Sequence, residues 1–455
     1  MAGQFLQRLC NLITTSEPFD PETLSYVRRA FEDTLAVACA GWAEPVTRKV
    51  ASNYRGGEEM TPDDPSGVDS EAAAMIYGTA AHALDFDDVH QVSNTHPSAP
   101  IVAGLVTAVK EEPRLAPRTI TAFGIGLACN VELGRVMGFA HYEKGWHATS
   151  TIGPLACAAA LSFLYGLDAK GASHALALAA AQCGGLQRNF GTMAKPLHAG
   201  LAGAAGLRAA RLARAGLTGD DDIFGERGYF DLYSGDKLST DPDKVEFDLY
   251  GGGIAVKLYP CCYNNHRNIA LAFEARKALE EKGLTVEDVG KVEVEGPYGA
   301  FMALRIKEPP RVGSEAKFCG AYVAACALID GEVGLAHFED DNVSRADVRA
   351  LSDRISLTER PKGQDKVTRD KAPVKLTVYN RDGEAVVQIE RVAAPGAPDD
   401  APTPEQMEAK VRDCLDYYSR NTGRNFDYGR FQAFVDGLFR DPSADEQPSL
   451  ALGDD

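Results

Sequence analysis

The residues best suited to chemistry lie together in one short stretch, AHALDFDDVHQVSNTHPSAP, which covers residues 81–100. Imidazole and carboxylate groups are the side chains that most readily exchange protons near neutral pH. Ionisable groups are costly to bury without partners, so a dense group of them between apolar segments indicates an active site. The alternative is a solvated acidic loop with an ordinary helix cap. The stretch contains three histidines and three carboxylates: His82, His90, His96, Asp85, Asp87 and Asp88.

Four later stretches also combine charged residues with small ones. They are KGWHATS with His147, GTMAKPLHAG with Lys195, KLYPCCYNNH with Lys257 and His266, and EAKFCGAY with Tyr322. Lys195 precedes a proline at the expected start of a helix, and helix N-termini attract anions. Three of the stretches also have a structural interpretation, with His147 as a helix cap, Lys195 as a surface lysine and Tyr322 as a core side chain.

Composition limits the possible partners. The chain has 455 residues, a formal net charge of −18 and ten cysteines. This negative charge disfavours binding to nucleic acid or to anionic membranes. No apolar run reaches about 18 residues, so we expect no transmembrane helix, and the N-terminus lacks the pattern of a signal peptide. Cysteines without a CxxC pair are typical of reduced thiols, so we expect a cytoplasmic protein, and Cys261-Cys262 is weak evidence for a metal or redox role.

Helical spacing of apolar residues extends over most of the first 266 residues. Asp20-Pro21 is a typical helix start, and Gly41 is a typical stop. Many positions in this part are alanine or glycine, which we attribute to close helix packing rather than to phosphate binding. The spacing predicts helices over 5–13, 21–41, 71–83, 98–111, 118–138, 148–165, 168–183 and 196–215.

The pattern changes after His266. A helix is expected over 267–282, an alternating strand over 291–295 and a helix over 315–330. Two further alternating runs, VKLTVYN and EAVVQIERV, are joined through Asp382-Gly383, which is a strong hairpin signal. A capping box that begins at Thr403 starts another helix.

These patterns predict a mainly α protein with an α+β second domain. The helical domain is expected to comprise residues 1–266, completed by 403–455. The smaller α+β domain is expected over 267–394, and a Pro-rich linker over 395–402.

The motifs, in this order, resemble those of the MmgE/PrpD family. They are DFDD, THPSAP, GWHATSTIG, GTMAKPLHAG, KLYPCC and EAKF, and the similarity extends over about residues 5–440. Members of the family include 2-methylcitrate dehydratase, cis-aconitate decarboxylase and iminodisuccinate epimerase. The resemblance implies a large helical domain with a smaller α+β lid, an active site between them, a homodimer, and no metal or organic cofactor.

The resemblance also implies roles for individual residues. Carried over motif by motif, the catalytic set is Asp85, His96, His147, Lys195 and Tyr322, and the substrate-binding candidates are Lys257 and His266. The activities of the family share one step, in which a proton leaves or joins a carbon next to a carboxylate. We expect His96 and His147 to exchange this proton and Asp85 to orient His96. Lys195 and Lys257 are expected to hold the carboxylates of the substrate.

Two positions depart from the decarboxylases of the family, which carry a threonine just after DFDD and a histidine after the proline of the KLYP-like block. Val89 and Cys262 stand there in this chain, which favours a dehydratase of a di- or tricarboxylate such as 2-methylcitrate. The block at Lys257 also differs from that of the dehydratase. The alternatives are an aminodicarboxylate epimerase and a cis-aconitate decarboxylase. From other classes, the alternatives are a metal-dependent enzyme that uses the DFDDVH segment and a non-catalytic helical scaffold.

Overall fold

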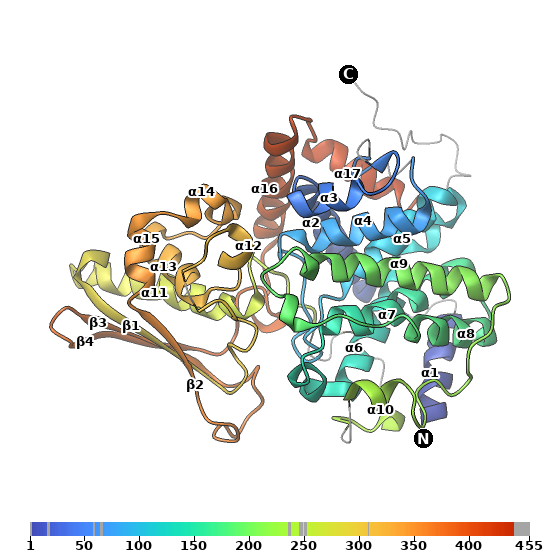
Figure 1. Ribbon diagram of the computed structural model, residues 1–455, viewed down its shortest axis with the longest axis horizontal. Coiled ribbons are helices and arrows are strands. Elements are labelled where there is room, and N and C mark those ends of the chain that lie inside the picture. Colours follow the sequence, from blue (N-terminus) through green and yellow to red (C-terminus); the bar gives the residue numbers. More distant parts are fainter. Residues whose placement is uncertain are drawn as a thin grey trace. The chain divides into compact units, whose positions relative to one another are not determined.

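The computed structural model divides into two compact units. Unit 1 comprises residues 1–188, 194–255 and 404–455, and unit 2 comprises residues 189–193 and 256–403. Unit 1 is helical and unit 2 combines helices with a small sheet (Figure 1), so the predicted fold class is confirmed. The structure describes residues 2–15, 19–57, 60–63, 67–234, 238–244, 249, 253–307 and 309–440.

The division differs in detail from the predicted domains. Residues 256–266 and the Pro-rich residues 395–402 belong to unit 2, whereas the sequence suggested a boundary after residue 266 and a separate linker. The backbone of this part explains the assignment of the Pro-rich segment. The amide of Val256 donates a hydrogen bond to the carbonyl of Gly396 at 2.9 Å, which ties the two ends of unit 2 together. The C-terminal part of the helical domain is described as far as residue 440.

Unit 1 is built from helices close to the predicted ranges. Asp20 caps the second helix by accepting a hydrogen bond from the amide of Thr23, as its sequence predicts. The helices are α1 Ala2–Thr14, α2 Pro21–Trp42, α3 Pro45–Ala51, α4 Ser70–Ala83, α5 Ser98–Glu111, α6 Thr119–Glu143, α7 Ala148–Tyr165, α8 Ala169–Ala180, α9 Ala194–Arg214, α10 Tyr229–Ser234, α16 Pro404–Thr422 and α17 Tyr428–Gly437. The short helices α3 and α10 were not predicted.

Helix α9 is central to unit 1, because it packs against α4, α5, α7 and α8 (Figure 1). Small residues allow the close approach of α9 to α4. A Cβ atom added to Gly200 of α9 would lie 2.2 Å from the carbonyl oxygen of Met75, and one added to Gly78 of α4 would lie 2.8 Å from that of Ala199. The glycines therefore serve packing, as predicted. This contact brings the first turn of α9 beside the C-terminal end of α4.

Two helical segments of unit 1 are long and apolar enough to cross a membrane by length and composition, Pro113–Glu143 and Ala148–Tyr165. The sequence had predicted none. Within the protein, however, 83% and 94% of the apolar 18-residue stretches of these two segments are buried. Their apolar faces are thus covered by neighbouring helices, as in α7, which packs against α6, α8 and α9.

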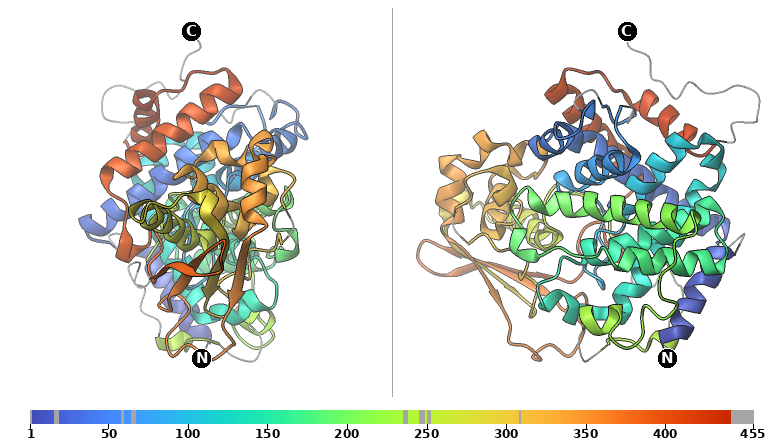
Figure 2. Two further views of the ribbon diagram at one scale, coloured as in Figure 1. Left: turned by 90° about the vertical axis from the view of Figure 1, so that its left-hand side faces the viewer. Right: turned by 45° about the vertical axis from the view of Figure 1, so that its right-hand side comes forward.

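Unit 2 contains a four-stranded sheet in the order β2-β1-β3-β4 (Figures 1 and 2). β1 pairs in parallel with β2 and antiparallel with β3, and β3 and β4 form the predicted hairpin, whose Gly383 has a φ of 81°. Helices α11 and α13 pack against the sheet. The elements are β1 Val289–Gly296, β2 Ile355–Glu359, β3 Val374–Asn380, β4 Ala385–Arg391, α11 His266–Glu281, α12 Gly313–Ala316, α13 Gly320–Asp330, α14 Asp340–Val343 and α15 Ala346–Ser352.

The helix predicted over 315–330 is interrupted in the structure. Its residues belong to α12 and α13, with a break at 317–319. The carbonyl of Lys317 accepts hydrogen bonds from the amide of Cys262 and from the side chain of Asn265, at 3.1 and 3.2 Å. This carbonyl is therefore turned to the segment at 262–265 instead of continuing a helix, a tertiary contact that the local pattern does not reveal.

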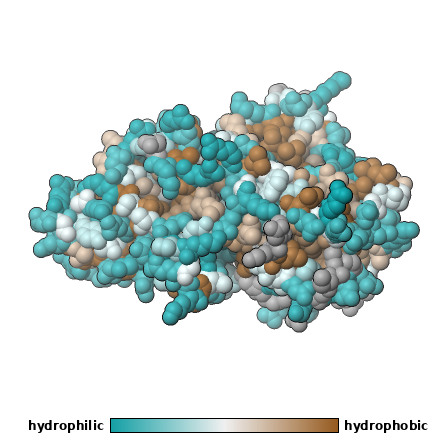
Figure 3. All heavy atoms as spheres, turned by 60° about the horizontal axis from the view of Figure 1, so that its bottom comes forward, coloured by the Kyte–Doolittle hydropathy of each residue, from teal (hydrophilic) through white to brown (hydrophobic). Residues whose placement is uncertain are grey.

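The face in Figure 3 is mainly hydrophilic, in keeping with the negative charge of the chain, and also shows hydrophobic groups. Single exposed leucines occur on helices of unit 1, among them Leu201 and Leu212 of α9 and Leu232 of α10, which is 66% exposed. Scattered apolar residues of this kind are common on protein surfaces.

We expect Gly200→Ala to destabilise the protein by about 1–3 kcal/mol, because the added methyl group has no space between α9 and α4. Denaturant unfolding of the variant and the wild type would measure the change. Gly184→Ala is the control, since a Cβ atom at Gly184 meets nothing within 4 Å. Equal losses in the two variants would contradict the prediction.

Candidate functional site

The turn between α4 and α5 carries the DFDD residues into the interior of unit 1. All four residues are buried. Asp85 adopts the left-handed conformation, with a φ of 51°, which is costly for a residue other than glycine and often marks a functional site. The turn is anchored further along by Val89, whose backbone pairs with that of Ala255 through hydrogen bonds of 2.9 and 2.8 Å.

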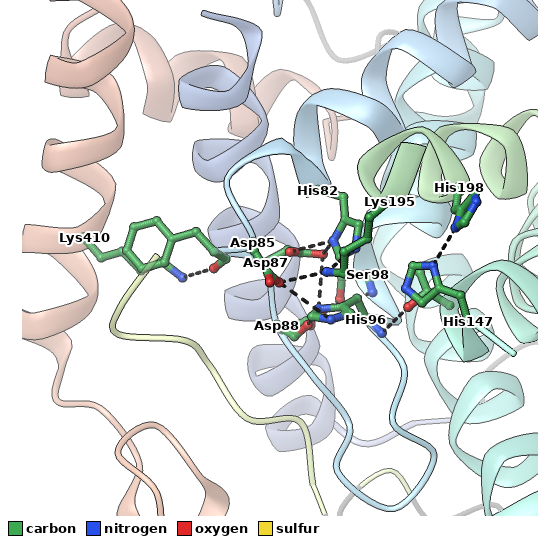
Figure 4. Close-up of polar contacts among 12 residues, drawn as sticks. His82, Asp85, Asp87, Asp88, His96, Ser98, His147, Lys195, His198 and Lys410 are labelled. Carbon is green, nitrogen blue, oxygen red and sulfur yellow. Dashed lines mark hydrogen bonds and ion pairs between the residues drawn. The ribbon is translucent and has the colours of Figure 1, made fainter. Parts of the chain in front are cut away.

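Lys195 reaches this turn from the first turn of α9 (Figure 4). Its ammonium group lies 3.1 Å from Asp85 Oδ1 and 2.9 Å from His82 Nε2. The side chain is only 5% exposed, so the alternative of a surface lysine is wrong. Because Lys195 donates to His82, the Nε2 atom of His82 acts as the acceptor.

His82 connects Lys195 to a second carboxylate. Its Nδ1 atom lies 2.7 Å from Asp87 Oδ2, so the tautomer that accepts from Lys195 at Nε2 donates to Asp87 at Nδ1. Burial lowers the pKa of His82, while Asp87 opposes this effect. The result is a continuous hydrogen-bonded chain from the ammonium through the imidazole to the carboxylate.

His96 lies beside this chain and is more accessible than His82. Its Nδ1 atom donates to the carbonyl of Asp88 at 2.9 Å, and its side chain is 11% exposed, against 0% for His82. Its Nε2 atom lies 3.8 Å from Asp85 Oδ1. Asp85 is thus closer to Lys195 than to His96, and the carbonyl of Asp88 accepts the hydrogen bond from His96 Nδ1. That Asp85 fixes the tautomer of His96 stays a prediction.

His147 and His198 form a buried imidazole pair next to His82. Their Nδ1 atoms are 3.0 Å apart, so one donates and the other accepts, and the ring of His147 stacks on that of His82 at 5.7 Å. Burial lowers the pKa of His147 well below its usual value and that of His198 to about 4. Both rings are therefore neutral at pH 7. His147 occupies the N-cap position of α7 but makes no side-chain cap bond.

Asp88 bonds to the first residue of α5. Its carboxyl group accepts hydrogen bonds from the hydroxyl group and the amide of Ser98, at 2.5 and 3.3 Å. Burial, with Asp87 and Asp33 nearby, raises its pKa to about 8. Asp88 therefore helps to hold the turn on the start of α5 rather than to exchange a proton with His96.

His90, the remaining histidine of the turn, belongs to a separate buried network. Its Nδ1 atom lies 2.7 Å from the hydroxyl of Ser93, which in turn lies 2.6 Å from that of Thr95. Thr95 donates to the side chain of Asn130 at 2.7 Å. Burial lowers the pKa of His90 to about 3. These contacts support the shape of the turn and assign His90 a structural role.

The structure brings together four of the predicted site residues and adds three. Asp85, His96, His147 and Lys195 form one cluster in unit 1, and His82, Asp87 and His198 complete it. Sequence spacing could have identified His198, because it follows Lys195 by three residues and so shares its helix face. His82 and Asp87 lay within the polar stretch, but their hydrogen bond depends on the turn.

The other predicted site residues lie in unit 2. Lys257 and His266 are fully buried, and the ring of His266 contacts those of Tyr259 and Tyr263 at 5.1 and 4.8 Å. The hydroxyl of Tyr322 donates to the carbonyl of His337 at 2.6 Å, and burial raises its pKa. This contact fits the core interpretation of Tyr322, and its catalytic role stays a prediction.

Four residues of the cluster could also hold a metal ion. One ligand atom from each of His82, Asp85, Asp87 and His96 lies within 4.8 Å of the others. Imidazole and carboxylate donors suit zinc and several other transition metals. A cation among them would compete with the ammonium of Lys195 for Asp85 and His82. The donor set fits a metal only if that ammonium moves.

Comparison with known proteins points to one family. The MmgE/PrpD N-terminal domain matches residues 7–241, and the MmgE/PrpD C-terminal domain matches residues 259–426. Cis-aconitate decarboxylase from Mus musculus is 29% identical over 355 residues, 73% of this chain and 71% of the relative. The enzyme of that name from Aspergillus terreus is 26% identical over 377 residues, 77% of this chain and 76% of the relative.

The human relative is matched over a smaller part of its length. Cis-aconitate decarboxylase from Homo sapiens is 29% identical over 303 residues, 64% of this chain. The match spans 61% of the human protein, which is less than two thirds of its length.

We expect the protein to lose stability in mild acid partly through His90. Its pKa is about 3 in the folded protein, against about 6.5 in an unfolded chain, so the unfolded chain binds more protons between these values. The stabilisation is therefore present above pH 6.5 and is lost as the pH falls towards 3, with about 2 kcal/mol lost at pH 5. His90→Asn, which can still bond Ser93, should lose less stability between pH 7.5 and pH 5 in urea unfolding. Equal losses in the variant and the wild type would contradict this role.

Proposed function

Because the chain belongs to the MmgE/PrpD family, we propose that it is a lyase that acts on a small di- or tricarboxylate by moving a proton at a carbon next to a carboxylate. The observation that carries the proposal is the buried ammonium of Lys195, held between Asp85 and His82 in a cluster of imidazoles. The protein needs no metal or organic cofactor in this proposal.

Lys195 supplies positive charge where the reaction develops negative charge. Removing a proton next to a carboxylate creates a carbanion-like transition state, and a fixed charge in a site shielded from water stabilises it strongly. Asp85 and the chain through His82 to Asp87 hold the ammonium in one position. Such preorganisation means that little reorientation is needed when the reaction occurs.

His96 is the candidate that exchanges the proton with the substrate. In the neutral tautomer that donates from Nδ1 to the carbonyl of Asp88, the Nε2 atom of His96 carries the lone pair that a general base uses. It is also partly accessible, which a group that meets substrate requires. His147, neutral and paired with His198, is the second candidate, and the pair offers a route for a proton to pass from one ring to the other.

The carboxylates of the substrate need more positive charge than Lys195 provides, because the negative charge of Asp85 already offsets the charge of that ammonium. We propose that Lys257 of unit 2 binds a carboxylate of the substrate, as the family motif implies. We further propose that His266 binds the substrate and that Tyr322 donates a proton. A homodimer and a cytoplasmic location are likewise proposals that rest on the family and on the composition.

Three reactions are compatible with proton transfer at a carbon next to a carboxylate. The motif differences at Val89 and Cys262 favour dehydration, as of 2-methylcitrate, over decarboxylation. The similarity to several proteins named cis-aconitate decarboxylase favours decarboxylation instead. Epimerisation of an aminodicarboxylate is the third outcome. A metal-dependent reaction is a second candidate mechanism, because four side chains of the cluster could act as ligands.

A substrate screen in D2O tests the proposal. We expect the protein to act on at least one of citrate, 2-methylcitrate, cis-aconitate or an aminodicarboxylate. Decarboxylation, epimerisation or hydration should place deuterium in the product next to a carboxylate, whereas dehydration should release the proton of that carbon to the solvent. NMR identifies the product, and release of CO2 distinguishes decarboxylation from dehydration and epimerisation. We expect turnover to survive exhaustive chelation. Loss of turnover with bound metal, and its return when the metal is restored, would support the metal-dependent candidate instead.

We expect His96→Ala to lower kcat on the identified substrate by roughly 10²–10⁴-fold, as removal of a general acid or base does. Lys195→Met should lower kcat to a similar degree if its charge acts in the transition state. Lys257→Ala should mainly raise KM if its contact is equal in the ground and transition states. Steady-state kinetics with unfolding curves for each variant would measure these effects.

The control is His174→Gln, a histidine of α8 that accepts a hydrogen bond from the amide of Gly219. Its kcat should equal that of the wild type. If His96→Ala and His147→Ala both kept the kcat of the wild type, proton transfer would have to be reassigned to Lys195, Tyr322 or His266.

A further inference from the structure

A buried lysine of helix α16 contacts the turn that carries the site carboxylates. Lys410, which is labelled in Figure 4, is 3% exposed. Its ammonium donates a hydrogen bond to the carbonyl of Phe86 at 2.9 Å. The same group lies 4.2 Å from the centre of the Phe86 ring. Both contacts fall on the residue between Asp85 and Asp87, which bond to Lys195 and His82.

The same ammonium forms a fully buried ion pair. Lys410 Nζ lies 2.6 Å from Asp33 Oδ1 of α2, whose side chain is 0% exposed. A buried ion pair recovers its desolvation cost only with good geometry and further hydrogen bonds, and Phe86 supplies one of these. Lys410 thus joins three segments that are far apart in sequence, α2, the turn after α4, and α16.

The contact with Phe86 lies where the turn needs support. Asp85 is in the left-handed conformation, which persists only where the surroundings enforce it. A shift of the Phe86 peptide would move the carboxylates on both sides of it, and with them Lys195 and His82. Small displacements of catalytic groups of about 1 Å can cost 10²-fold in rate.

We propose that Lys410 is a positioning residue, which holds the peptide of Phe86 so that Asp85 and Asp87 meet Lys195 and His82. This inference deepens the proposed function and rests on it for its kinetic consequence. It assigns helix α16 a direct part in shaping the site. The competing explanation is that Lys410 only neutralises the buried charge of Asp33.

A double variant separates these explanations. Lys410→Met alone would leave Asp33 charged and buried without a partner, which is strongly destabilising. Lys410→Met combined with Asp33→Asn removes both charges and still removes the donor to Phe86. Lys410→Arg keeps the charge and the donors, and is the rescue variant. Arg412→Met removes an exposed cation from the same helix, which pairs with Glu408, and is the control.

Two measurements decide the outcome. The first is kcat on the substrate found in the screen, where we expect the double variant to fall roughly 10²-fold, with Lys410→Arg restoring part of it and Arg412→Met unchanged. The second uses no substrate. NMR spectra of protein labelled at histidine should show shifted resonances of His82 and His96 in the double variant, assigned through substitutions of each.

A folded double variant with kcat within about twofold of the wild type and unchanged histidine resonances would overturn the proposal and support simple neutralisation. If the wild type turned over none of the substrates, the proposed function would fail on its own, and the NMR measurement would still decide the role of Lys410. Shifted resonances would then support positioning, and unchanged ones would overturn it.

Discussion

The structure of the site depends on the burial of four carboxylates within unit 1. Asp33, Asp85, Asp87 and Asp88 are at most 3% exposed, and a carboxylate removed from water to this degree needs a partner or must take up a proton. Each of these four side chains meets this requirement with a different partner. Asp85 pairs with Lys195, Asp87 with His82 and Asp33 with Lys410. Asp88 bonds to the hydroxyl and amide groups of Ser98, and its pKa, raised to about 8, leaves it largely protonated at pH 7.

These partners come from separate parts of the chain, so the site and the fold depend on one another. Lys195 lies in the first turn of α9, His82 lies in the last turn of α4, and Lys410 lies on α16, the helix that returns to unit 1 after unit 2. The close packing of α4 against α9, which Gly78 and Gly200 permit, brings the first two together. A substitution that loosened this packing would therefore lower the stability of unit 1 and shift the ammonium group of Lys195.

Much of the fold could be predicted because helices and hairpins have local signals. The cap at Asp20, the spacing of apolar residues in α4 to α9 and the Asp382-Gly383 turn each depend on neighbours in the chain. The break between α12 and α13 could not be predicted, because a contact with residues 262–265 produces it. The short α3 and α10 were missed for a related reason, since helices of this length depend on tertiary packing more than on propensity.

For the site, the sequence by itself determined which residue types were available and roughly where they would gather. The polar stretch at 81–100 and the motif at Lys195 indicated where a site could lie, and the resemblance to the family motifs nominated Asp85, His96 and Lys195 within them. Only the tertiary structure decided the pairing, including the preference of Asp85 for Lys195 over His96 and the contact of Lys410 with Phe86. The physical reason is that a hydrogen bond requires two groups within about 3 Å in a suitable orientation, and residues separated by more than a hundred positions acquire that geometry only when the helices pack.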